Sequence, residues 1–140
     1  MTEITGLGPL VSRILGHLED GSYREGFCEP FERGSAAGNA CIVADPEDPG
    51  EFAFQVQMSV MRAPPGREAD LFRRLLELNH GFRGRAAFSL DRHGVVSLMA
   101  ARPVRDLDPS EVVDLILWTS QQADRFDDVL LKEFGYEHAL

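Results

Sequence analysis

The sequence predicts an α+β fold in which an antiparallel sheet carries its helices on one face. Residues Glu51–Met61 alternate between apolar and small or polar side chains, as a strand with one buried face does. Apolar side chains recur at three- and four-residue steps in Leu7–Glu19 and in Arg67–Asn79, which is typical of amphipathic helices. The predicted order is helix, three strands, helix, two strands, helix (αβββαββα). Because short turns join successive strands, their pairing should be antiparallel.

The length and composition are sufficient for a hydrophobic core without metals or disulfides. It has 140 residues, 44% of them hydrophobic, so we expect one domain over residues 1–140. The net charge of −9 argues against nucleic acid as a partner. Nine arginines and four acidic residues lie between positions 62 and 105, so this stretch carries +5 and the rest carries −14. The basic stretch is either a solvated face or a surface for an acidic partner.

No targeting or membrane-spanning segment is visible in the sequence. Residues Met1–Gly6 have no basic region followed by a long apolar run, and the apolar run Val112–Trp118 is too short to cross a bilayer. We therefore expect a cytoplasmic protein without a membrane partner. Cys28 and Cys41 lack the spacing of a metal-binding or redox pair. They either face each other across a hairpin that turns at Gly34–Ser35, or are two small buried thiols, the state favoured in a reducing compartment.

The first half of the chain begins with the helix Leu7–Glu19, whose apolar side chains form a narrow stripe. A strand over Tyr23–Phe31 follows. Pro30 marks it as an edge strand, because proline cannot donate a hydrogen bond to a central ladder. The segment Gly34–Asn39 is rich in turn residues, and a short strand is expected at Ala40–Ala44.

The middle of the chain holds the clearest strand and the central helix. One face of the strand is apolar, and the other carries the small uncharged set Ala53, Gln55, Gln57 and Ser59. The helix Arg67–Asn79 has an apolar arc wider than one sheet face requires, and Gly81 suits its left-handed end. Either this helix is buried deeply in its own monomer, or it lies between its own sheet and a second copy of the chain.

Two strands, Arg85–Asp91 and Val95–Arg102, are expected after the central helix. A three-residue loop with Gly94 in the left-handed conformation pairs Asp91 with Val95. This register places two apolar sets on one face of the sheet: Ala86, Phe88 and Leu90 with Val96, Leu98 and Ala100.

The final helix is predicted from its first turn. Asp108 is the N-cap, Pro109 occupies the first helical position and Glu111 completes a capping box, and the helix should run to about Phe134. Trp118 lies near its middle, either as a core residue or as an anchor at an interface.

The residue types that catalysis or metal binding requires form no recognisable motif. The four histidines are scattered without paired-ligand spacing, and there is no GxSxG or kinase-type motif. Cys28 has no neighbouring base that the sequence identifies. We therefore expect no cofactor, no metal and no enzymatic activity, and a domain that binds another protein.

Four segments carry a resemblance to a known family. LFRRLLELN (71–79), AFSLD (87–91), GVVSL (94–98) and LDP (107–109) resemble the class I type III secretion chaperone-like superfamily, especially its YbjN and Tir-chaperone (CesT) branches. The resemblance covers mainly residues 71–134, and the αβββαββα order agrees with the family's fold. It implies a small acidic cytosolic homodimer that presents apolar grooves to a partner polypeptide, an effector or a regulatory protein, and holds it extended. YbjN-like members have been linked to regulation.

Two surfaces are expected to carry function. A partner-binding groove would combine the first helix with the uncharged strand face, through Leu7, Leu10, Ile14, Leu18, Gln55 and Gln57. The alternative is that the helix simply packs on the sheet and the strand face is a mildly polar surface. A homodimer contact would centre on Phe72, Leu75, Leu76, Val96 and Leu98. A second function to consider is a small-ligand sensor or regulatory domain, which needs an enclosed pocket with convergent polar groups.

Overall fold

The computed structural model describes residues 4–135 and has the αβββαββα order that the sequence predicts. The helices are α1 (Leu7–Asp20), α2 (Glu68–Phe82) and α3 (Pro109–Phe134), and a short 3-10 helix, η1 (Ser22–Glu25), follows α1. The strands are β1 (Phe27–Arg33), β2 (Ala36–Ala44), β3 (Phe52–Arg62), β4 (Ala87–Leu90) and β5 (Val95–Pro103).

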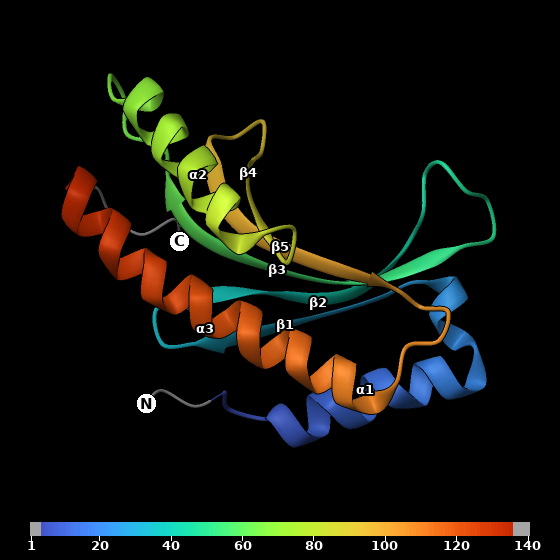
Figure 1. The fold of residues 1–140 in the computed structure, drawn as a ribbon. Helices are drawn as coiled ribbons and strands as arrows, with labels where there is room; N and C mark the ends of the chain where they lie inside the picture. Colours follow the sequence, from blue (N-terminus) through green and yellow to red (C-terminus); the bar gives the residue numbers. More distant parts are fainter. Residues whose placement is uncertain (1–3, 136–140) are drawn as a thin grey trace.

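The five strands form one antiparallel sheet in the order β1-β2-β3-β5-β4. The long helix α3 crosses the sheet, with α1 beside it near β1 and α2 beside β4 (Figure 1). All three helices therefore lie on one face of the sheet, which confirms the predicted fold class. The other face carries no helix from the described part of the chain.

The core lies between α3 and the sheet. Phe54, Val56 and Met58 alternate along β3 toward the helices and are fully buried. A register shift between β3 and β5 at Ser59/Met61 then brings Val60 and Met61 into the core together. Such a bulge places two successive side chains on one side and bends the strand around the helix.

The β4–β5 hairpin has the predicted register. The Asp91 N–H donates to the Val95 carbonyl at 3.0 Å, and Phe88 lies opposite Leu98. Phe88 and Leu98 are buried, whereas Leu90 at the end of β4 remains 47% exposed.

The predicted start of α3 is also confirmed. The Glu111 N–H donates to Asp108 Oδ1 at 2.9 Å, and the Asp108 N–H donates to Glu111 Oε1 at 3.1 Å, so the capping box is complete. Trp118 is partly buried, with the guanidinium of Arg85 4.0 Å from the centre of its ring.

Helix α2 ends later than predicted, at Phe82, and Gly81 lies inside it. Arg83, with φ 55°, takes the left-handed closing position instead. The extra turn brings the Phe82 ring against the rings of Trp118 and Phe126, at centroid distances of 5.7 Å. The packing of Phe82 against α3 thus outweighs the local preference for ending a helix at a glycine such as Gly81.

The first hairpin differs from the prediction at both ends. Tyr23 belongs to η1 and packs edge-on against Phe52, so β1 begins only at Phe27. The turn is limited to Gly34 and Ser35, and β2 already begins at Ala36. The reason is a contact with α3, because the Ser35 N–H donates to Asp124 and its hydroxyl bonds to the buried carboxylate of Asp127.

The arginine-rich middle of the chain meets acidic residues of α3. Arg74 forms an ion pair with Glu133 at 3.0 Å, and Arg85 and Arg102 both approach Asp114. These side chains are partly exposed, so each pair adds little stability. The acidic residues that face these three arginines thus belong to α3 of the same chain, and not to a separate partner.

Candidate functional site: the open face of the sheet

The face of the sheet opposite the helices, called the open face below, presents two rows of aligned side chains. The first row is Cys28, Cys41, Gln55 and Ala101, and the second is Pro30, Asn39, Gln57, Met99 and Ala87. Each member lies directly across from the next on neighbouring strands. The two rows therefore form a continuous band across the sheet.

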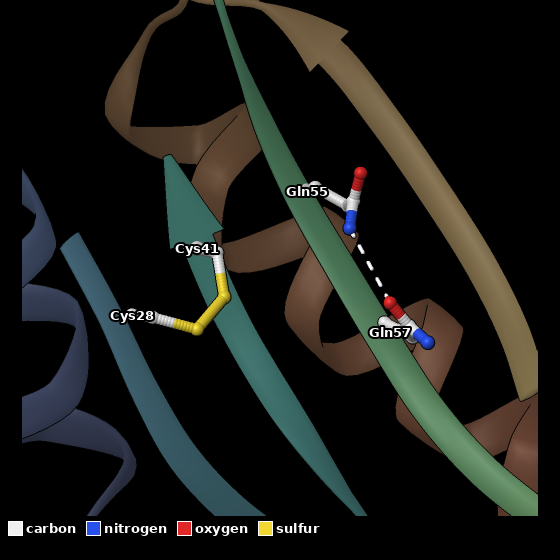
Figure 2. The surroundings of a disulfide bond; sticks show 4 residues. All are labelled: Cys28, Cys41, Gln55 and Gln57. Atoms are coloured by element: carbon white, nitrogen blue, oxygen red, sulfur yellow. Dashed lines mark hydrogen bonds between the residues drawn. A yellow bond between two sulfur atoms is a disulfide. The ribbon is translucent and has the colours of Figure 1, made fainter. Parts of the chain in front are cut away.

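The band contains no charged side chain. It consists of small apolar groups, a thioether, a disulfide and carboxamides, and Gln55 Nε2 donates to Gln57 Oε1 at 3.4 Å (Figure 2). Removing such groups from water costs much less than removing charges. Their amides can also donate and accept hydrogen bonds to a partner's main chain. The band is thus suited to contact with an extended polypeptide.

The predicted alternative in which the cysteines face each other is confirmed. Cys28 and Cys41 lie opposite each other on β1 and β2, with Cα atoms 4.0 Å apart, and are joined by a disulfide (Figure 2). Cys28 is exposed, whereas Cys41 is 8% exposed. The bond forms the outer end of the first row, next to Gln55.

The helical half of the predicted groove is not available. Leu10 and Ile14 are buried in the core, and Leu7 and Leu18 are partly buried against it. Helix α1 lies on the helix-bearing side of the sheet, where Arg13 pairs with Glu29 at 3.2 Å. A groove shared by α1 and Gln55 and Gln57 therefore does not form, because the two lie on opposite faces. The narrow stripe of α1 is satisfied within the core.

Both edges of the sheet are protected against addition of another strand. On β1, Pro30 has no N–H to donate, and Ile4 forms a bridge to Arg33. On β4, Asn79 Oδ1 accepts from the Phe88 N–H at 2.6 Å, while Asn79 Nδ2 donates to the Phe88 carbonyl at 3.3 Å. A partner is therefore expected to contact the side chains of the open face more than the strand edges.

A second surface is the apolar groove between α2 and β4, called the α2–β4 groove below. Leu76 on its rim is 69% exposed and Leu90 is 47% exposed. The groove is lined by Phe72, Leu75, Leu76, Asn79, Phe88, Ser89 and Leu90. It includes three of the residues expected at a dimer contact, Phe72, Leu75 and Leu76.

The other two residues expected there, Val96 and Leu98, are fully buried. They point into the core beneath the helices, so they cannot contact a second folded copy. Phe88 and Leu90 of β4 line the groove in their place. In the sequence, the only hint that β4 lines this groove was the position of Leu90 directly before the polar turn Asp91–Gly94.

Other polar clusters have structural explanations. His17 Nδ1 contacts the Ser22 hydroxyl, and the Ser22 N–H donates to Asp20 at 2.8 Å, which closes the end of α1. The Ser22 hydrogen bonds lower the pKa of Asp20, so this carboxylate is a poor base. Within residues 4–135, no cluster of three His, Cys, Asp or Glu residues could hold a metal. No helix in that range is long and apolar enough to cross a membrane.

Comparison with known proteins defines first a class of fold and then a family. The solved structure titled "Crystal Structure of the ExsC-ExsE Complex" matches with a TM-score of 0.60 at 17% identity, over 86% of this chain and 96% of that chain. The chain thus has a secretion-chaperone fold. Residues 34–132 match the YbjN family, described as "Putative bacterial sensory transduction regulator". The protein belongs to the YbjN family. No curated protein sequence matches the chain.

Proposed function

We propose that this protein is a non-enzymatic domain, formed by residues 1–140, that holds a partner polypeptide in extended form as a cytoplasmic chaperone or adaptor. The observation that carries the proposal is the uncharged band across the open face, centred on Gln55 and Gln57. The family description, a regulator of sensory transduction, fits a domain that acts by holding an effector or regulatory protein.

The open face favours a partner bound through side chains. Small groups such as Ala101 let an extended chain approach the sheet closely, and the two glutamine amides offer hydrogen bonds to its peptide groups. Because Pro30 and Asn79 protect the sheet edges, most of the binding free energy would come from area buried on this face.

The proposal includes a homodimer that uses the α2–β4 groove. Leu76 lies at the rim of the groove, and Asp70, Arg73 and Glu77 flank it on the exposed side of α2. A two-fold contact between antiparallel copies of α2 would hide the exposed leucines and bring opposite charges together. This contact would leave both open faces free for partners.

A small-ligand sensor is the second candidate, and the family description favours it. A candidate ligand site is the open depression between the β2–β3 loop and the end of β5, lined by Asp45, Phe52 and Arg102. The sensor would be supported by a compound from a small-molecule library that binds in this depression and raises the melting temperature of the protein.

Site-specific photo-crosslinking tests the chaperone proposal. A photoreactive amino acid at position 57 of the open face should capture one partner in the cells that make this protein. The same amino acid at exposed Gln121 of α3 is the control and should capture much less. Equal capture at both positions, or capture from position 121 alone, would contradict the proposal.

A further inference from the structure

We infer that Cys28–Cys41 is a thiol–disulfide exchange site, which a protein dithiol reduces in the folded domain, and that its redox state sets how firmly β1 is held beside the open face. The first part depends only on the position of the bond. The second part deepens the proposed function, and rests on it, because it assigns a regulation to the same surface.

The bond is placed where an external thiol can reach it. It lies on the face without helices, at the outer end of the band, and joins the edge strand β1 to β2 (Figure 2). Cys28 is exposed and Cys41 is nearly buried, so attack on the Cys28 sulfur is favoured. Exposed disulfides are more easily reduced than structural ones that resist the cellular thiol pool.

The hairpin has other attachments that keep it in place after reduction. Seven residue pairs join β1 to β2, and Phe27 and Phe31 are buried in the core. Arg33 Nη1 donates to the Leu117 carbonyl of α3 at 2.8 Å and to the Ser120 hydroxyl at 3.2 Å. Loss of the covalent bond should therefore loosen β1 locally without unfolding the domain.

The exchange balances with one dithiol as the reductant. A thiolate of the dithiol attacks Cys28 Sγ, the Sγ–Sγ bond breaks, and Cys41 leaves as a thiolate that takes up a proton. The second thiol of the reductant then attacks its own sulfur in the mixed disulfide and releases Cys28. Two electrons have passed to the protein, the dithiol has become a disulfide, and the reverse reaction uses that oxidised form.

The cytoplasmic location that the proposed function includes would also favour a reversible bond, although the exchange site does not depend on it. A disulfide in a reducing cytoplasm is usually transient or redox-sensing. Reduction would free β1 to move relative to β2 and would place two thiols beside Gln55. A less rigid face loses more entropy when it binds, so the oxidised form should bind an extended partner more tightly.

Reduction in native buffer tests the exchange site directly. Oxidised protein is titrated with dithiothreitol, quenched with N-ethylmaleimide and weighed by mass spectrometry. Both cysteines should be alkylated while the circular dichroism spectrum and cooperative unfolding are retained. Amide exchange in β1 and β2 should accelerate by about tenfold, and β5 should not change. The Cys28→Ser/Cys41→Ser variant should show the same exchange pattern without dithiothreitol.

Two results would overturn the exchange site: a bond that resists dithiothreitol until denaturant is added, or reduction that unfolds the whole domain. Crosslinking from position 57 tests the regulation, with a several-fold lower yield expected for the reduced protein. Equal yields in both states would remove the regulation and leave the proposed function standing. Absence of capture in both states, with reduction as predicted, would refute the proposed function and leave the exchange site intact.

Discussion

At the scale of single residues, Asn79 replaces a missing strand. Its carboxamide makes both hydrogen bonds that a neighbouring strand would make to Phe88 at the outer edge of β4. Asn79→Ala should leave these main-chain groups without their partner and lower the free energy of unfolding by about 1–3 kcal/mol. Urea unfolding measures the change. Asn39→Ala, which removes an exposed amide of β2, is the matched control, and an equal loss in both variants would contradict this role.

Asp108 should make stability depend on pH. The Ser110 hydroxyl and the Glu111 N–H donate to its carboxylate and lower its pKa in the folded protein. Because the unfolded pKa of about 3.9 is higher, the stabilisation is complete above that pH and is lost as the pH falls through the folded pKa. Asp108→Asn keeps an acceptor but does not titrate. Its melting temperature should be lower than that of the wild type at pH 7, and the gap should narrow at pH 3. A constant gap would contradict the prediction.

Residue-level features were predictable where neighbours in sequence determine them. The Asp108 cap and the Asp91–Val95 pairing follow from side chains within a few positions of each other. The state of Cys28 and Cys41 stayed open, because it depends on the length of a turn that Ser35 fixes through α3. Contacts with a distant helix leave no local pattern in the sequence.

At the scale of elements, the α2–β4 groove should hold the second copy of the chain. Leu76→Glu places a charge on the rim of this groove and should convert a dimer into a monomer, as measured by light scattering at tens of micromolar protein. Leu76 is 69% exposed, so the fold should be retained. Ser12→Glu on the exposed side of α1 is the control. A monomeric wild type would refute the dimer.

Element positions were easier to predict than the surfaces the elements expose. The stripe of α1 gave the helix correctly, yet periodicity does not indicate whether the stripe meets the core or a partner. For that reason Leu10 and Ile14 were predicted to line a partner groove, whereas they lie in the core. Val96 and Leu98 were misassigned in the same way, because an apolar strand reads alike whether α3 or another molecule covers it.

At the scale of the molecule, all three described helices lie on one face of the sheet, and the opposite open face is the proposed partner site. Gln55→Glu/Gln57→Glu should leave the fold intact, because both side chains are only partly buried, and should weaken capture of the crosslinked partner by at least several-fold. The added charges must lose water when the partner binds. Gln121→Glu/Gln122→Glu adds the same charge on α3 and is the matched control. Equal capture by the two double variants would move the partner site elsewhere.

The position of α3 after all five strands has a consequence for synthesis on the ribosome. All five strands are translated before residue 109, but the apolar side of β3 is covered mainly by a helix that ends at Phe134. Until α3 leaves the exit tunnel, the core side of the nascent sheet therefore stays exposed to water. During that time Arg74, Arg85 and Arg102 also lack their acidic partners on α3. The sheet therefore completes its core only after α3 has been synthesised, and we expect a chain terminated before α3 to be a substrate for proteases and the cell's general chaperones.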